Sequence, residues 1–333
     1  MRFLFLLFSL SLFASTHTND IPYRLQWRNN LGYCGETSLI NAALFYGQYI
    51  SQYDVRALVT KDHRQNDGEL LLGANDTHAA RKLHLQFEEW DNSTEQNTDQ
   101  FLIWVKQFIV QGYPVAIGIY ANQYLFYRNH DPYAGDPDYD HIVTAFAITS
   151  SNPNDPTYNG TDQLAFSDHG LWHNQNTPVY YFNYAFDPFQ GDRLQANSPN
   201  GPIYTLPNHN SNYGIAITGI IDPKHETFPI RVTTDYNYED PPILDHSNIR
   251  PEPMPLTLTI TISNLKPHFT YVLYRYNTLE SVPDSDFNAH ASQAYQTWTF
   301  TPTSSTWTQT EQILSNEMAI YRCVFQQLST TII

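Results

Sequence analysis

A cysteine with the surroundings of a catalytic nucleophile lies in the stretch LGYCGETSL, residues 31–39. A thiol attacks a carbonyl carbon as the thiolate, and a helix N-terminus together with an imidazolium lowers its pKa. Cys34 lies at the predicted start of a helix, where its backbone N–H could donate to an oxyanion. Gly32 and Gly35 leave room for a substrate carbonyl. The pattern indicates a nucleophile, with half of a disulfide and a small core residue as the alternatives.

The groups that would assist this thiol are expected on other elements. His141 heads the apolar stretch HIVTAFAITS and is the candidate general base. Asp168 ends the stretch QLAFSD, and its carboxylate would orient the imidazole if the two strands pair. A side-chain amide upstream of the cysteine could supply a second oxyanion donor. Gln26 is the best candidate for this role, and closer alternatives are Asn29 and Asn30.

Three other assignments of these residues stay open. His169, next to Asp168, could be the base. A disulfide could join Cys34 to Cys323, although Cys323 lies in the apolar stretch MAIYRCVF and fits a buried strand better. A metal site could form in a loop rich in Asp and His, from His130, Asp131, Asp138 and His141. Because no tight ligand spacing supports a metal, we expect neither a metal nor another cofactor.

The elements that must position these groups follow from the apolar spacing. The first part of the chain predicts helices over 34–50, from a cap at Ser51 to residue 58, and from a cap at Thr98 to residue 111. Strands are expected at 114–120, 141–148, 163–168 and 213–221, the second and third as a hairpin. Helices followed by strands predict an α+β domain over residues 20–222.

The composition changes after Pro223, where proline becomes frequent and short alternating stretches follow. In LTLTITISNL the apolar side chains would face one side, at Leu256, Leu258, Ile260 and Ile262. Further strands are expected at 268–278, 295–302 and 318–325. Residues 225–333 therefore predict a small β-sandwich, which resembles fibronectin type III-like or immunoglobulin-like domains. It contains no catalytic constellation.

The first domain resembles a known family. Gln26, the Gly-Tyr-Cys-Gly helix start at residues 32–35, the stretch GYPVAIGIY, His141 and Asp168 together resemble papain-like cysteine peptidases, and most closely the bacteriocin-processing, double-glycine peptidase-like branch. The likeness covers residues 22–221. It implies N-terminal helices packed on an antiparallel sheet, with the active site between them. It also implies that Cys34 is the nucleophile, His141 the general base, Asp168 its orienting group and Gln26 the oxyanion donor.

The N-terminus has the layout of a secretory signal peptide, predicted over residues 1–16. Arg2 is followed by an apolar run at 3–13, which is too short to span a bilayer, and then by small residues. The sequence predicts a secreted or lumenal protein. Three glycosylation sequons support secretion weakly, at Asn75, Asn92 and Asn159.

Charge and the absence of competing motifs narrow the function. The formal net charge of −16 argues against nucleic acid or an anionic membrane as a partner. No later stretch is long and apolar enough for stable membrane insertion. Neither a GxSxG nor an HExxH motif occurs. The sequence therefore predicts a secreted thiol peptidase acting on a peptide or protein. The alternatives are an inert binding protein on the same scaffold and a transglutaminase- or amidase-type acyl transferase.

Overall fold

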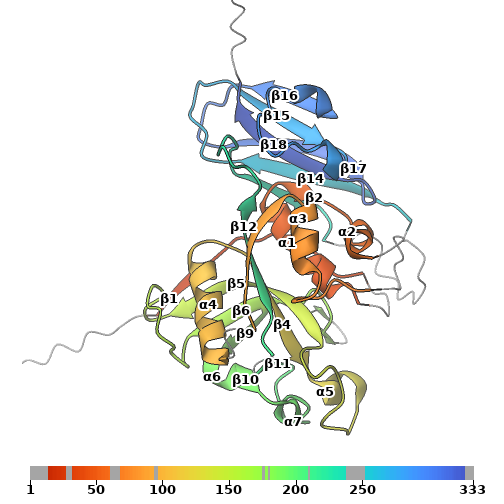
Figure 1. Cartoon of the computed structure of the whole chain (residues 1–333), viewed down its shortest axis with the longest axis vertical. Coiled ribbons are helices and arrows are strands. Elements are labelled where there is room, and N and C mark those ends of the chain that lie inside the picture. The colour runs from red at the N-terminus through yellow and green to blue at the C-terminus, as the bar shows by residue number, and fades with distance from the viewer. Residues whose placement is uncertain are drawn as a thin grey trace, which may run out of the picture.

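A computed structural model describes residues 14–27, 32–60, 68–93, 97–174, 177–178, 181–208, 211–237 and 252–326. Helices and antiparallel sheets alternate along the chain, so the α+β prediction is confirmed at this coarse level (Figure 1). The helices are α1 (Cys34–Phe45), α2 (Gln52–Val59), α3 (Asp76–Lys82), α4 (Thr98–Val110), α5 (Gln123–Tyr127), α6 (Phe186–Phe189), α7 (Arg193–Ala196) and the 3₁₀ turns η2 (Leu279–Ser281) and η3 (Ala291–Gln293).

A nine-stranded sheet of described residues forms the centre of the lower body in Figure 1. Its main path is β10 (Gln190–Gly191), β11 (Tyr204–Pro207), β4 (Val115–Ala121), β5 (His141–Ser150), β6 (Gln163–Ser167) and β9 (Tyr181–Ala185). Three further strands extend it: β1 (Ser15–Thr18) beside β5, β12 (Gly214–Ile220) beside β4, and β3 (Leu85–Glu89) beside β12. A separate ribbon pairs β7 (His173–Asn174) with β8 (Thr177–Pro178).

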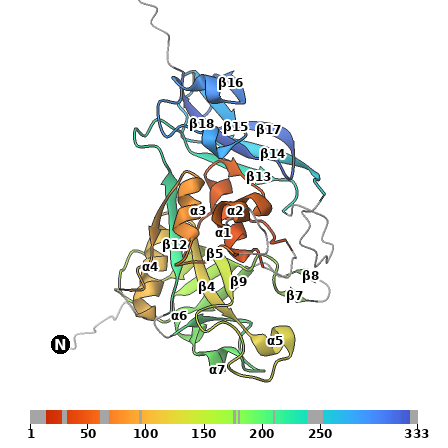
Figure 2. The ribbon, with the colours of Figure 1, turned by 45° about the vertical axis from the view of Figure 1, so that its right-hand side comes forward.

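Helices pack on both faces of this sheet. Successive side chains of β5 point to opposite faces and therefore contact different helices. Ile142 belongs to the core shared with α1, and Asn41 of α1 donates a hydrogen bond to Thr144 over 3.3 Å. Val143 and Ala145 belong to the core shared with α4. The predicted hairpin is confirmed, because β5 and β6 pair antiparallel. The start of β5 thus lies where α1 begins (Figure 2).

The first helix is shorter than the predicted 34–50. It ends at Phe45 because Gly47 adopts a positive φ of 77°, which turns the chain. The next residues form β2 (Gln48–Tyr49), which pairs with β18 (Ala319–Phe325) near the C-terminus. A side chain at position 47 would also clash, since a Cβ there would lie 2.8 Å from that of Ile230. The strand that follows the first helix is therefore part of the C-terminal sheet.

The C-terminal part forms two antiparallel sheets. One contains β13 (Ile230–Thr234), β14 (Pro255–Ile262) and β17 (Trp307–Leu314). The other contains β16 (Gln296–Phe300), β15 (Tyr271–Tyr276), β18 and β2. The predicted inward face of β14 is confirmed, because its apolar side chains are buried: Leu256, Leu258, Ile260 and Ile262. One hydrophobic core includes these residues and α1, so packing is continuous across the predicted boundary at 222–225.

Several predicted boundaries differ from the structure. Asn97, rather than Thr98, caps α4 by accepting from two backbone N–H groups, whereas Ser51 caps α2 as predicted. The sequence did not indicate α3 or β3. Residues 1–13 of the predicted signal peptide lie outside the described residues, and β1 overlaps its predicted end. No helix in the described ranges has the length and apolar character needed to cross a membrane.

Candidate active site

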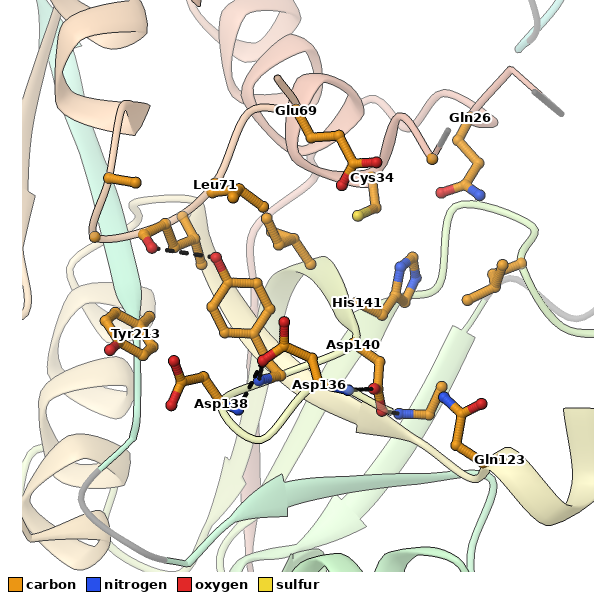
Figure 3. Close-up of a pocket in the computed structure, with 18 of the residues that line it drawn as sticks. Gln26, Cys34, Glu69, Leu71, Gln123, Asp136, Asp138, Asp140, His141 and Tyr213 are labelled. Carbon is orange, nitrogen blue, oxygen red and sulfur yellow. Dashed lines mark hydrogen bonds between the residues drawn. The ribbon is translucent and has the colours of Figure 1, made fainter. Parts of the chain in front are cut away.

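A cleft of about 660 Å³ lies where the N-terminus of α1 meets the start of β5 (Figure 3). Cys34 points down from α1 toward the ring of His141 in this view, and Gln26 lies beside them. Three predicted site residues therefore line one cleft. The other lining residues are Gly32, Glu69, Leu71, Leu72, Gly73, Ala74, Ala121, Gln123, Tyr127, Asp136, Asp138, Tyr139, Asp140, Ile142, Leu171 and Tyr213.

Cys34 is the first residue of α1, as predicted, and is partly exposed. Tyr33 precedes the helix and makes no side-chain cap to its first turn. Gly32 has a positive φ of 62° and lines the cleft. Gly35 has another role than predicted, since a Cβ there would lie 2.1 Å from the Leu70 carbonyl oxygen. Its missing side chain admits the segment before α3, not the substrate.

Glu36 holds this segment against the helix. Its carboxylate is buried, accepts from the Leu70 backbone N–H at 3.0 Å and pairs with Arg56 at 2.7 Å. The Arg56 guanidinium stacks 3.7 Å from the ring centre of Tyr33 and donates to the Gly32 carbonyl. Burial raises the pKa of Glu36, and Arg56 opposes that shift. This network fixes both sides of the chain around the cysteine.

The expected lowering of the thiol pKa is not found. Burial raises the pKa of Cys34 to about 12, and the negative charges of Glu36 and Glu69 add to this shift. The backbone N–H groups of Ile142 and Gly35 face the sulfur and oppose it. The resting cysteine is therefore a neutral thiol at neutral pH.

His141 is also neutral at rest. Burial lowers the pKa of its imidazole to about 4, while a hydrogen bond to Asp168 opposes the shift. Its Nε2 lies 3.1 Å from the Asp168 backbone oxygen. Because a carbonyl only accepts, Nε2 carries the proton and Nδ1 keeps its lone pair. The ring also stacks on Tyr204, with centres 5.8 Å apart. This arrangement leaves Nδ1 as the basic atom of the ring.

Asp168 contacts His141 differently from the sequence prediction. The backbone carbonyl makes the contact, and the carboxylate instead accepts from the N–H groups of Gly170 at 2.9 Å and Trp172 at 3.2 Å. Burial raises the pKa of this carboxyl to about 7. Pairing of β5 with β6 brings the two residues together as expected, but the acid shapes the turn after β6. No hydrogen bond joins its carboxylate to the imidazole.

No hydrogen bond joins the Cys34 thiol to the His141 ring within the described structure. The two side chains share the cleft and converge on it from α1 and β5 (Figure 3). Catalytic hydrogen bonds commonly tighten only when substrate is bound. Without a substrate, Cys34 and His141 are thus a neutral pair. Their hydrogen bond would form when a substrate binds.

Gln26 reaches the cleft from an extended segment that is held at its backbone. Its N–H donates to the His169 carbonyl at 3.0 Å, and the next N–H, of Trp27, donates to the Gln52 side chain at 2.6 Å. In Figure 3 its amide group lies close to Cys34. The oxygen of that amide has no hydrogen-bond partner. The alternative donors, Asn29 and Asn30, lie outside the described residues.

The other assignments can be placed as well. His169 does not line the cleft; its Nε2 lies 2.8 Å from the Ser38 hydroxyl and its Nδ1 3.4 Å from the Asn41 amide. Cys34 and Cys323 are both free, so the disulfide alternative is wrong, and Cys323 is a buried residue of β18 as predicted. Across the described ranges, no group of three His, Cys, Asp or Glu side chains is placed to hold a metal ion.

The sequence prediction missed part of the cleft wall. Glu69 lies beside Cys34, Asp136 lies across the cleft from it, and Asp138 lies farther along, toward Tyr213 (Figure 3). The acid-rich stretch DPYAGDPDYD, directly before His141, is a signal that could have indicated two of these three carboxylates. Glu69 follows a stretch outside the described residues and has no such local signal.

Comparisons of the chain with protein-family models, curated proteins and solved structures give no match.

Proposed function

We propose that the chain is a secreted papain-like thiol hydrolase that cleaves peptide bonds with Cys34 and His141. The observation that carries the proposal is that these two residues, from distant parts of the sequence, line one cleft at a helix N-terminus. The fixed tautomer of His141, with a lone pair on Nδ1, supports its role as the base. The residue pattern that resembles papain-like peptidases supports the same reaction.

The neutral state of both groups favours proton transfer during attack over a preformed ion pair. The Cys34 sulfur attacks the carbonyl carbon while its proton passes to Nδ1 of His141. The oxyanion accepts from the Cys34 backbone N–H and the Gln26 amide. His141 then protonates the leaving amine, and a thioester remains. Water attacks the thioester as His141 takes its proton, which releases the acid and restores the thiol.

The pH dependence of thiol reactivity tests this assignment. We expect iodoacetamide to label Cys34 at a rate that rises about tenfold per pH unit from pH 7 to 10, because the thiolate fraction of a thiol with a pKa of about 12 grows at that rate. Peptide hydrolysis should persist below pH 6 and decline near pH 4, where His141 becomes protonated and ceases to be a base. Both rates are measured by mass spectrometry.

Cys323 is the internal control, since its side chain is 0% exposed and should stay unlabelled in the folded protein. A labelling rate that levels off below pH 7 would contradict the neutral pair. Absence of labelling at every pH, with Cys34 still reduced, would contradict the role of Cys34 as the nucleophile.

The proposed signal peptide is tested on the same protein. The protein is taken from the culture medium of expressing cells, and its first residue shows where the signal peptide is cleaved. Cleavage before Ser15 would keep β1 intact.

Asp168→Asn separates the two possible contacts to His141. We expect kcat/KM to fall less than about tenfold, because the carbonyl that accepts from Nε2 remains. Some loss is expected, since one asparagine atom cannot accept from Gly170 or Trp172. Steady-state kinetics and the imidazole ¹⁵N shifts give the two readouts. A loss as large as that of His141→Ala would show that the carboxylate orients the ring during catalysis.

A second candidate is an inert binding protein on the same scaffold. The raised thiol pKa and the missing hydrogen bond between Cys34 and His141 favour it. The same cleft could also transfer an acyl group to an amine, as a transglutaminase- or amidase-type acyl transferase would. Assays with peptides in the presence and absence of an added primary amine distinguish the three: free acid indicates hydrolysis, an amide product indicates transfer, and neither product indicates binding.

A further inference from the structure

One half of the cleft is acidic and lacks basic side chains. In Figure 3 carboxylates extend from Cys34 and His141 toward Tyr213, with Glu69 on one wall and Asp136 and Asp138 on the other. Of the described residues that line the cleft, none is a lysine or an arginine. Gln26, which lies on the other side of the cysteine in Figure 3, carries no charge. The negative charge is therefore confined to one direction from the reacting sulfur.

The fourth acidic residue of the cleft differs because it is neutralised. Asp140 forms an ion pair of 2.6 Å with Arg193 and accepts from the backbone N–H of Ala121 at 2.8 Å. Its other oxygen accepts from the Asp136 N–H at 2.8 Å. Arg193 also stacks 3.8 Å from the ring centre of Tyr120. Asp140 and Arg193 thus hold the shape of the turn that carries the two outer carboxylates.

The remaining three carboxylates have no such partner. Among the described residues, no lysine or arginine forms an ion pair with Glu69, Asp136 or Asp138. Asp136 accepts from the N–H groups of Asp138 and Tyr139, which are neutral donors. Arg56 acts on Glu69 through space but is committed to Glu36. The cleft therefore holds an excess of negative charge.

The backbone of Glu69 is held in place, although its side chain is exposed. The Leu70 N–H that follows it donates to the buried Glu36 carboxylate at 3.0 Å, and its own carbonyl accepts from the Asn75 amide at 2.9 Å. The Leu70 carbonyl packs into the space left by Gly35. These contacts fix the backbone of Glu69 on both sides, at a place from which its carboxylate reaches the thiol (Figure 3). Asn75, which is also one of the predicted glycosylation sites, forms these contacts through both amide atoms.

From this geometry we infer that the cleft selects peptides with a lysine or arginine side chain next to the bond that is cleaved. The inference rests on the proposed hydrolase and names its substrate class. A cationic side chain lying toward Tyr213 would pair with carboxylates on both walls. An acidic side chain would meet like charge in a partly enclosed site, which disfavours it.

The same contact would assist the chemical step. Glu69 is one of the two charges that raise the pKa of Cys34. A substrate cation paired with Glu69 offsets that effect and makes loss of the thiol proton easier. The basic substrate should therefore have a higher kcat as well as a lower KM, whereas an effect on binding alone would lower KM only.

The test compares matched fluorogenic peptides with Lys, Gln or Glu at each position flanking the bond, assayed with EDTA so that no divalent cation contributes. We expect kcat/KM to be at least about tenfold higher for the best Lys peptide than for its Gln partner, and lower for Glu. Glu69→Gln, Asp136→Asn and Asp138→Asn should each lower the Lys/Gln ratio by about two- to fivefold. The matched control is Glu280→Gln, an exposed acid on η2, which should leave the ratio unchanged.

A second arm reads the cleft without hydrolysis. Methanethiosulfonate reagents with a trimethylammonium or a sulfonate group label Cys34, and each rate is divided by that of the same reagent with a small free thiol. We expect this normalised rate to be at least about fivefold higher for the cationic reagent at low salt, with the difference shrinking near 1 M salt. Charge-selective labelling without cleavage of any peptide would refute the hydrolase but keep the acidic selectivity. Cleavage with no preference for Lys, or labelling with no preference for the cation, would overturn the inference and leave the hydrolase standing.

Discussion

Replacing Cys34 by alanine is expected to lower kcat for peptide hydrolysis by at least about a thousandfold, because it removes the atom that forms the acyl intermediate. The described residues of the cleft wall include no serine or threonine that could take its place. His141→Ala is expected to lower kcat by at least about a hundredfold, since the attacking thiol is neutral and needs a base. Initial rates with a Lys-containing peptide measure both effects.

Each variant has a matched control at a residue of the same type. Cys323→Ala changes the other cysteine, which is buried in β18, and should lower stability without changing kcat. His169→Gln changes the neighbouring buried imidazole, which hydrogen-bonds Ser38 and Asn41. The folded fraction of the His169→Gln variant should keep most of the kcat of the unsubstituted protein. If Cys34→Ala retained more than about a tenth of the rate, the thiol mechanism would be wrong. A loss in His169→Gln equal to that in His141→Ala would transfer the role of base to His169.

The sequence could indicate the helix start at Cys34 and the hairpin before Asp168, because both depend on local patterns of apolar residues and turns. The pairing of β5 with β6 then brings Asp168 to His141 without further information. Which atom of Asp168 makes the contact is not a local property. The carboxylate is drawn to the N–H groups of Gly170 and Trp172, and the carbonyl is left to face the ring.

The pKa of Cys34 could not be predicted from its own surroundings in the sequence. A helix start favours the thiolate, but burial and two carboxylates act in the other direction. The sequence places Glu36 in the first turn of the helix. Glu69 lies near the thiol only because Gly35 leaves room for the Leu70 backbone. Likewise, the pairing of β2 with β18 joins segments from opposite ends of the chain, and no local pattern encodes it. Long-range packing therefore decides the chemistry at this site.

The buried pair of Glu36 and Arg56 should have the largest effect on stability among the groups around the cleft. Their side chains are 1% and 0% exposed, and the carboxylate also accepts from the Leu70 N–H. We expect Glu36→Ala to lower the free energy of unfolding by about 3–5 kcal/mol, because Arg56 loses this carboxylate inside the protein. Urea unfolding followed by circular dichroism measures the change.

The size of this effect can be separated from the loss of a packed side chain. Glu36→Gln keeps an acceptor for Leu70 but not the charge, so its effect should be intermediate. Combining Glu36→Leu with Arg56→Met removes both charges and should recover much of the stability, as replacement of both partners of a buried pair often does. The control is Asp284→Ala. Asp284 pairs with His84, but its side chain is 64% exposed, so the substitution should change stability little.

The same substitution also connects stability to selectivity. Without the Glu36 carboxylate, the Leu70 N–H loses its acceptor, and the Glu69 backbone loses one of the contacts that hold it beside the thiol. The folded fraction of Glu36→Ala should therefore lose part of its preference for Lys peptides, and the double variant should remain as unselective as the single one despite its recovered stability. A fully restored Lys/Gln ratio in the double variant would show that Glu36 contributes to folding alone and that Glu69 is held by other contacts.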